Sequence, residues 1–194
     1  MKIGVLALQG DFAEHIQVLK RLGVATAEVR LPRHLDGLDG LILPGGESTT
    51  MGKLCVDFNL LAPLQQFGQS QPVWGTCAGA ILLSRDVRRS QPLLGLMDIR
   101  IARNAFGRQV DSFEADLDIE PLKRATHTDA PYHAFFIRAP IIEMVAGNAR
   151  VLGSLPDGRI VAAQQGKLLA TSFHPELTSD TRFHEYFLSF VHPS

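Results

Sequence analysis

Hydrophobic and polar positions change period repeatedly along the first half of the chain. Residues 3–8 form a continuous apolar run, after which Phe12, Ile16 and Leu19 recur at helical spacing. Further apolar runs, each typical of a strand buried on both faces, occupy residues 27–31, 40–43 and 72–75. Strands that alternate with helices predict an α/β fold, with a three-layer, open, mostly parallel sheet and helices on both of its faces.

The second half of the chain has shorter and partly alternating apolar runs. They predict strands at residues 98–102, 113–117, 135–138, 151–155, 160–164 and 168–173. The turn residues Pro156, Asp157 and Gly158 predict that residues 151–164 form a hairpin. Helical spacing over residues 180–191 predicts a closing helix, and residues 121–133 are expected to form an irregular surface loop.

Composition narrows the class of protein. Of 194 residues, 45% are hydrophobic and 20% are charged, and the formal net charge is −1 without any basic block. Nucleic acid is therefore not expected as a partner. The apolar N-terminal run is too short for a signal peptide, and no run reaches the length of a membrane span. With two cysteines, no disulfide framework is expected. We expect a cytoplasmic protein with one domain over residues 1–194 and no membrane association.

The candidate nucleophile is Cys77. It lies in the sequence Gly-Thr-Cys-Ala-Gly at residues 75–79, between a predicted strand and an apolar helix predicted over residues 78–83. A nucleophile between two closely spaced glycines at such a junction is typical of a nucleophile elbow, which exposes the reactive atom at the end of a strand. The helix N-terminus there favours the thiolate that attacks. A buried structural cysteine is the alternative.

The second cysteine has a different setting. Cys55 shares the apolar face of a helix predicted from about residue 49 with Met51, Leu54 and Phe58. Core packing is therefore the better interpretation of Cys55.

A general base and its orienting carboxylate are predicted at His174 and Glu176. His174 directly follows the last predicted strand, and Pro175 restricts the backbone between the two side chains. Alone, His174 would be interpreted as a histidine that caps a strand end. Together with Cys77, it completes a nucleophile, base and carboxylate.

The other histidines show no spacing typical of a metal site, and no metal is expected. The cluster of His127, Asp129 and His133 is better explained by loop polarity. These remaining histidines are His15, His34, His127, His133, His184 and His192.

An oxyanion hole is predicted from backbone amides. Gly45 and Gly46 follow the predicted strand at residues 40–43, beside the expected position of the elbow. An elbow enzyme needs the amide after the nucleophile and a second amide from a neighbouring loop. We expect the Gly46 and Ala78 amides to fill these roles. A tight turn that Ser48 caps is the alternative interpretation.

These motifs together resemble the class I, triad-type glutamine amidotransferases, and within them the glutaminase subunits of pyridoxal 5′-phosphate synthase. The resemblance spans the chain, and the block at residues 103–114 is its most specific part. The segments that carry it are residues 4–10, 43–51, 75–79, 103–114, 136–140 and 172–178, which read GVLALQG, LPGGESTTM, GTCAG, RNAFGRQVDSFE, FIRAP and SFHPELT.

The resemblance implies a flavodoxin-like class I amidotransferase fold and hydrolysis of L-glutamine through a thioester on Cys77. It also implies that ammonia passes to a separate synthase (lyase) subunit, and that the glutaminase step needs no cofactor. The substrate-binding residues that it implies are Gly46, Glu47, Ser48, Arg103, Ile137 and Arg138. Surface ion pairing is the alternative role of the two arginines. Residues 121–133 look longer than the family pattern.

Three other functions remain to be weighed. The same reaction in another pathway, such as the glutaminase subunit of imidazole glycerol phosphate synthase, is disfavoured by Ala80 and Ile81, where many other amidotransferases carry Met-Gln. The related cysteine-elbow peptidases and chaperones have no reason to keep His-Pro-Glu. A regulatory binding module without activity has no need of an intact triad.

Overall fold

A single large sheet organises the molecule. The computed structural model describes residues 1–103 and 112–191. Five adjacent strands, each parallel to its neighbours, form one half of the sheet. In spatial order they are β2 (Ala25–Val29), β1 (Lys2–Leu6), β3 (Gly40–Leu43), β4 (Val73–Thr76) and β12 (Leu168–Thr171). This order is that of a flavodoxin-like doubly wound fold.

Antiparallel pairing extends the sheet beyond β12. There β11 runs antiparallel to both β12 and β9, and β9 runs antiparallel to β6. The added strands are β11 (Ile160–Gln165), β9 (Ile141–Val145), β6 (Met97–Ala102) and β5 (Ser84–Asp86), of which β5 runs parallel to β6, and β10 (Arg150–Ser154) pairs with β11 off this path. The hairpin predicted at residues 151–164 is thereby confirmed as β10 and β11.

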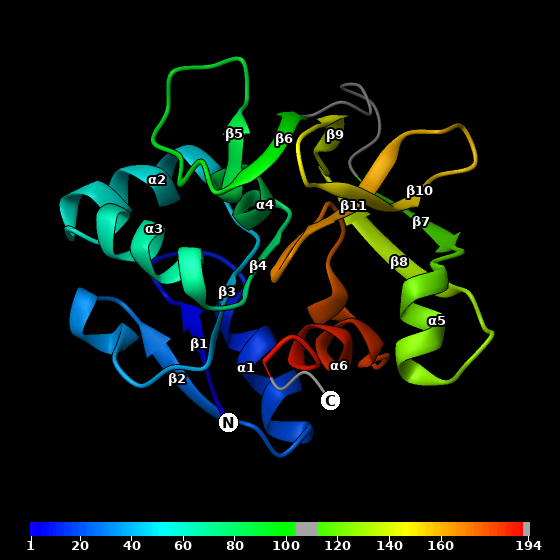
Figure 1. Cartoon of the computed structure of the whole chain (residues 1–194), viewed down its shortest axis with the longest axis horizontal. Coiled ribbons are helices and arrows are strands. Elements are labelled where there is room, and N and C mark those ends of the chain that lie inside the picture. The colour runs from blue at the N-terminus through cyan, green and yellow to red at the C-terminus, as the bar shows by residue number, and fades with distance from the viewer. Residues whose placement is uncertain (104–111, 192–194) are drawn as a thin grey trace.

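Helices cover both faces of the sheet (Figure 1). One face carries α2 (Ser48–Asp57), α3 (Leu61–Ser70) and α4 (Ala78–Leu83). The other carries α1 (Phe12–Arg21) and α6 (Arg182–Leu188), with α5 (Glu120–Thr126) packed against α6. The short ribbon of β7 (Ser112–Leu117) and β8 (Tyr132–Ile137) lies on the α6 side, and η1 (Pro32–Leu35) and η2 (Pro175–Leu177) are single 3₁₀ turns. The α/β prediction is confirmed.

Alternate residues of the central strands serve the two layers of helices. In β12, Leu168 and Ala170 join the core beneath α2 to α4, whereas Leu169 joins the core beneath α1 and α6. In β3, Leu43 joins the core beneath α2 to α4, and Ile42 joins the core beneath α1 and α6. Both faces of these strands are buried, which explains why the sequence shows continuous apolar runs rather than alternation.

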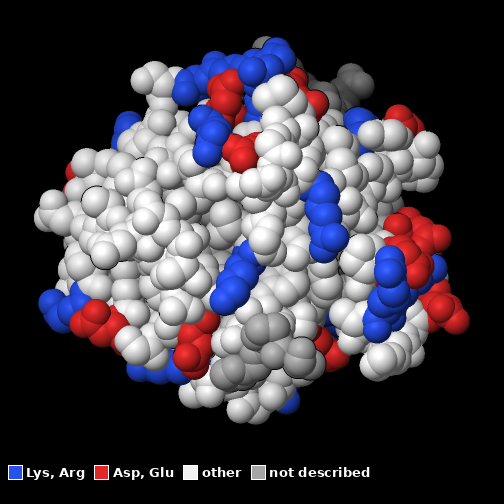
Figure 2. All heavy atoms as spheres, in the orientation of Figure 1, with Lys and Arg blue, Asp and Glu red and all other residues white. Residues whose placement is uncertain are grey.

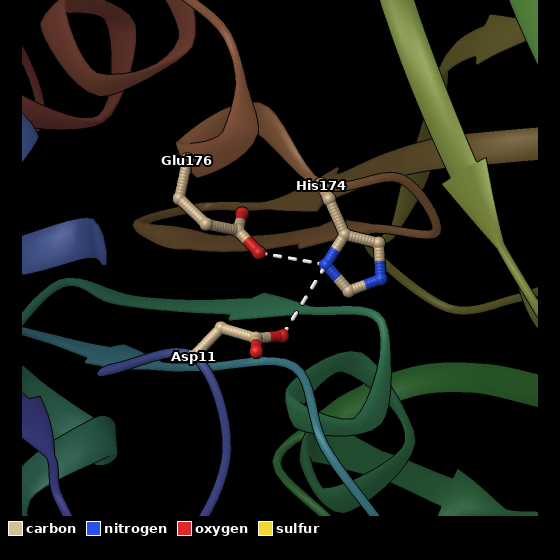
Figure 3. Close-up of side chains that lie close together, drawn as sticks. All are labelled: Asp11, His174 and Glu176. Carbon is tan, nitrogen blue, oxygen red and sulfur yellow. Dashed lines mark hydrogen bonds and ion pairs between the residues drawn. The ribbon is translucent and has the colours of Figure 1, made fainter. Parts of the chain in front are cut away.

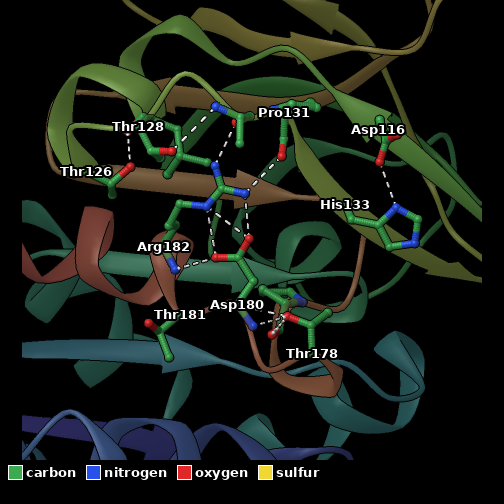
Figure 4. Close-up of polar contacts among 12 residues, drawn as sticks. Asp116, Thr126, Thr128, Pro131, His133, Thr178, Asp180, Thr181 and Arg182 are labelled. Atoms are coloured by element: carbon green, nitrogen blue, oxygen red, sulfur yellow. Dashed lines mark hydrogen bonds and ion pairs between the residues drawn. The ribbon is translucent and has the colours of Figure 1, made fainter.

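The prediction of an irregular loop at residues 121–133 is wrong. Helix α5 covers residues 121–126 of this segment, and β8 begins at Tyr132. The helix has only seven residues, and Leu122 is its one buried residue, so its sequence shows no helical period. Arg182 fixes the segment by donating to the carbonyls of Ala130 and Pro131 at 2.8 and 2.9 Å, and Asp180 holds the Arg182 guanidinium in place (Figure 4).

Charged side chains lie in mixed acidic and basic groups on the face that Figure 2 shows. The region over α3 is largely uncharged there, since that helix contains no acidic or basic residue. Within residues 1–103 and 112–191, no helix is both long and apolar enough to cross a membrane.

Candidate active site

Cys77 lies in the turn between β4 and α4. Its backbone has φ 47° and ψ −103°, a conformation that non-glycine residues rarely adopt. A methyl group at Gly79 would collide with the carbonyl oxygen of Leu43, so this position requires glycine for the close approach of α4 to β3. Strain of this kind is concentrated at functional sites, where the surrounding structure maintains it.

His174 and Glu176 form a buried pair beside this turn (Figure 3). Nδ1 of His174 lies 2.6 Å from Oε1 of Glu176, and the Glu176 side chain is fully buried. The backbone positions the imidazole as well, because the His174 amide donates to the carbonyl of Phe135 at 2.9 Å. Since β12 lies next to β4 in the sheet, His174 reaches the elbow from the end of the neighbouring strand.

Electrostatics couple His174 to both partners. Burial of the imidazole lowers its pKa, but hydrogen bonds to Cys77 and Glu176 outweigh burial and raise the pKa of His174 to about 10. With Nδ1 turned toward Glu176, Nε2 is the nitrogen left for Cys77. The arrangement favours a proton on the imidazole, which lies between the Cys77 side of the pocket and the Glu176 carboxylate.

Asp11 is a second carboxylate near the imidazole, and sequence reasoning missed it. Its Oδ2 lies 3.6 Å from Nδ1 of His174 (Figure 3). Asp11, His174 and Glu176 are the one group in the described part of the chain whose ligand atoms are close enough to hold a metal ion. However, Nδ1 of His174 donates its proton to Glu176, so it is not free to bind a metal.

A pocket of about 570 Å³ opens over Cys77. It brings together every residue that was assigned to catalysis, the oxyanion hole or glutamine binding, except the buried Glu176. Gln9, Asp11, Ile81, Pro140 and Leu177 line it in addition. The predicted residues in its lining are Gly46, Glu47, Ser48, Cys77, Ala78, Arg103, Ile137, Arg138 and His174.

Glu47 and Arg103 contact each other at the pocket mouth. Arg103 Nη2 lies 2.9 Å from Oε1 of Glu47, and Arg103 Nη1 donates to Oγ1 of Thr49 at 2.9 Å. The Glu47 carboxylate also accepts from the backbone amides of Thr49 and Thr50, where it acts as the N-cap of α2. Burial raises its pKa, but these hydrogen bonds prevail and lower the pKa of Glu47 to about 2. Of the family block at residues 103–114, residues 104–111 lie outside the described part.

Cys55 is fully buried in the core beneath α2. Burial raises the pKa of its thiol to about 12, so it is not a nucleophile near neutral pH. The prediction that Cys55 is a core residue is confirmed.

The histidine cluster needs one correction. His133 lies on β8 rather than in a loop, and its ring contacts Asp116 at 2.7 Å and Glu114 at 2.9 Å. Hydrogen bonds to these two carboxylates raise the pKa of His133. Figure 4 shows the ring turned toward Asp116 on the neighbouring strand β7.

Comparison with known proteins identifies the family of the chain. A profile of the SNO glutamine amidotransferase family matches residues 5–192. The chain belongs to this family. The family resemblance that the motifs predicted is thus confirmed.

Curated relatives match over nearly their full length. The pyridoxal 5′-phosphate synthase subunit PdxT of Herpetosiphon aurantiacus is 59% identical, with 97% of this chain and 99% of the relative covered. The subunit of the same name from Moorella thermoacetica is 56% identical, with 98% and 100% covered.

Solved structures support the family and the fold. A crystal structure of a glutamine amidotransferase is 47% identical and superposes with a TM-score of 0.90, covering 97% of this chain and 98% of that one. A structure of PurLQS from Thermotoga maritima is 15% identical with a TM-score of 0.74 and covers 98% of both chains. The second similarity concerns the fold alone.

Proposed function

We propose that this chain is the glutaminase subunit of a pyridoxal 5′-phosphate synthase and hydrolyses L-glutamine to L-glutamate and ammonia. One observation carries the proposal: Cys77, in a strained elbow, lines the same pocket as His174, and Nδ1 of His174 lies 2.6 Å from the buried Glu176. The relatives named above bear the same subunit name over the whole chain length.

The reaction proceeds in two halves. The Cys77 thiolate attacks the side-chain carboxamide of glutamine, and the C–N bond breaks as His174 delivers its Nε2 proton to the departing nitrogen. The product is ammonia and a γ-glutamyl thioester. His174 then takes a proton from water, whose oxygen attacks the thioester and releases glutamate. Glu176 keeps the imidazole oriented throughout.

Backbone amides complete the mechanism. Gly46 and Ala78 border the pocket beside Cys77, and their amides are proposed to stabilise the oxyanion of each tetrahedral intermediate. One such donor contributes about 3 kcal/mol to lowering the barrier. Arg103 and Arg138 offer donors for the substrate carboxylate, and Glu47, Ser48 and Ile137 complete the glutamine site.

Ammonia is proposed to pass to the synthase (lyase) subunit, which uses it to build the cofactor vitamer. The alternative is a glutaminase that serves another synthase, such as imidazole glycerol phosphate synthase. We further propose that residues 1–194 form one domain, because both core clusters flank the same sheet, and that this domain acts in the cytoplasm.

Labelling with a glutamine-like electrophile tests the proposal. The diazo ketone analogue of glutamine, incubated with the full chain and the synthase subunit, is expected to alkylate Cys77 alone, as peptide mass spectrometry would show. L-glutamine should protect Cys77, whereas D-glutamine, the matched control, should not. Labelling of Cys55, or labelling that L-glutamine leaves unchanged, contradicts the proposal.

A further inference from the structure

Two histidines outside the triad lie buried directly beneath it. His15 on α1 and His184 on α6 are both fully inaccessible to solvent, and Nδ1 of His15 lies 3.0 Å from Nε2 of His184. Both rings meet the Trp74 indole edge-on, at centroid distances of 5.7 and 4.9 Å. Polar groups buried this completely need partners, so the pair is expected to have a specific role.

Glu176 is the group that His15 faces. Oε1 of Glu176 is bonded to His174, whereas Oε2 has no hydrogen bond of good geometry among the described residues. Nε2 of His15 lies 3.4 Å from this Oε2, and both side chains are fully buried. The same Nε2 lies 3.2 Å from Oγ1 of Thr76. A buried carboxylate is costly unless N–H groups face its oxygens, and burial raises the pKa of Glu176 accordingly.

Both histidines are neutral, so each ring carries one N–H. Burial is the main cause that lowers the pKa of His15 well below its usual range, and the nearby His184 and His174 add to it. Burial, with the charge of Arg21, lowers the pKa of His184 to about 3. The direction of the bond between the two rings therefore decides which atom of His15 faces Glu176.

Only one direction is compatible with the surroundings. If His184 Nε2–H donates to His15 Nδ1, then His15 Nε2 carries its hydrogen toward Glu176 and Thr76. Of the four nitrogens in the two rings, only Nδ1 of His184 is then left without a hydrogen bond, and it carries a lone pair rather than a hydrogen. The reverse direction would bury an unpaired N–H on His184 and aim a lone pair of His15 at the carboxylate. Both changes are unfavourable.

We propose that His15 is a positioning residue of the catalytic triad: its Nε2–H holds Oε2 of Glu176, so that Oε1 stays on His174. The inference rests on the triad assigned under the proposed function. His184 fixes the tautomer of His15, and α1 thereby supports the base from the side of Glu176 that faces away from His174. Loss of this support lets the carboxylate turn, which lowers the rate of proton transfer and leaves glutamine binding unchanged.

Two variants of His15 that both carry a side-chain amide, His15→Gln and His15→Asn, test the proposal. The amide nitrogen of Gln takes the place of the imidazole Nε2, whereas the shorter Asn reaches only the place of Nδ1. With the full chain and the synthase subunit, His15→Asn is expected to lower kcat about tenfold with KM changed by less than about twofold. His15→Gln should recover kcat to within about threefold of the unsubstituted chain.

Phe187→Leu is the matched control, because Phe187 is fully buried on α6 in the same core and its side chain carries no polar atom. It should lower the melting temperature without changing kcat. Equal kcat values for His15→Asn and His15→Gln, or a KM effect that matches the kcat effect, would overturn the inference. A chain that releases no glutamate even without substitution would instead overturn the proposed function.

Discussion

Cys77 and Cys55 show how position decides the chemistry of a single residue type. Both thiols are buried, but Cys77 occupies a strained turn beside His174, whereas Cys55 lies among apolar side chains. His174 lines the same pocket as Cys77, whereas burial raises the pKa of the Cys55 thiol to about 12. Reactivity therefore follows from the neighbours that the fold supplies.

Replacement of Cys77 is expected to stop glutamine hydrolysis in a folded protein. Cys77→Ala removes the nucleophile and little packing, so glutamate release should fall below detection while the circular dichroism spectrum is unchanged. Cys55→Ala, the matched control, should keep kcat and lose about 1–2 kcal/mol of unfolding free energy through the cavity that it leaves. Substantial turnover by purified Cys77→Ala would show that the nucleophile is another group.

Substitutions of Arg103 and Glu176 should affect different kinetic constants, KM for Arg103 and kcat for Glu176. Arg103→Ala is expected to raise KM about tenfold, because a charge-assisted hydrogen bond to the substrate carboxylate contributes about 1.5–3 kcal/mol. Glu176→Gln should instead lower kcat at least about tenfold with little change in KM. The reason is that the Glu176 carboxylate stabilises the charge that develops on the His174 imidazole in the transition state and does not contact the substrate.

Arg100→Ala serves as the control for Arg103. Arg100 pairs with Asp86 at 2.7 Å and does not line the pocket, so its removal should leave both constants unchanged. Steady-state kinetics across glutamine concentrations measures all three variants. The reverse assignment, a KM effect from Glu176→Gln and a kcat effect from Arg103→Ala, would show that the roles are exchanged.

At the scale of elements, the buried strands of the sheet and the site motifs could be predicted from the sequence, whereas helices α3 and α5 could not. The strand at residues 40–43 and the helix at 78–83 match β3 and α4, because continuous apolar runs next to glycines are unambiguous. The sequence analysis did not predict helix α3, in which Pro63 occupies the first turn, where proline is tolerated. The proximity of His15 to Glu176 depends on packing between α1 and η2, which no local pattern records.

The N-cap of α2 should give the protein a pH-dependent contribution to stability. The folded-state pKa of Glu47 is about 2, below its ordinary 4.5, so the carboxylate stabilises the fold above pH 4.5. This contribution is lost as the pH falls from 4.5 toward 2. Glu47→Ala is therefore expected to lower the unfolding free energy by about 1 kcal/mol at pH 7.

Urea unfolding at several pH values measures the effect. The difference in unfolding free energy between Glu47→Ala and the unsubstituted chain should become steadily smaller below pH 4.5. Asp57→Ala is the control, because Asp57 is exposed at the opposite end of the same helix, where a negative charge does not stabilise the helix dipole. A Glu47→Ala difference that stays constant with pH would contradict the capping role.

At the scale of the whole molecule, we predict that the loop at Gly45 and Gly46, the proposed oxyanion loop, is the part that a partner switches. Gly46 has φ 146°, a conformation open to glycine, and Glu47 donates its backbone amide to the side chain of Gln9 at 3.0 Å. A peptide flip in this loop costs little and would move one oxyanion donor. A synthase subunit that docks against Gln9 and the loop would favour one of the two arrangements.

We therefore expect the isolated chain to be a poor glutaminase that its synthase subunit stimulates at least about tenfold, equivalent to about 1.4 kcal/mol of barrier. Ammonia release at saturating glutamine, with and without the purified synthase subunit, measures the effect. The synthase subunit of imidazole glycerol phosphate synthase is the control and should give no stimulation. Equal rates with and without the cognate subunit would exclude gating by the partner.

The central position of β12 ties activity to the order of synthesis. This strand comes last along the chain among those described, yet it inserts between β4 and β11 and carries His174 to the elbow. A chain still emerging from the ribosome already holds Cys77, the Gly46 loop and β3, but it has neither His174 nor β12, the second pairing partner of β4. We therefore expect that an incomplete chain does not hydrolyse glutamine, and that hydrolysis begins only after β12 has paired with β4.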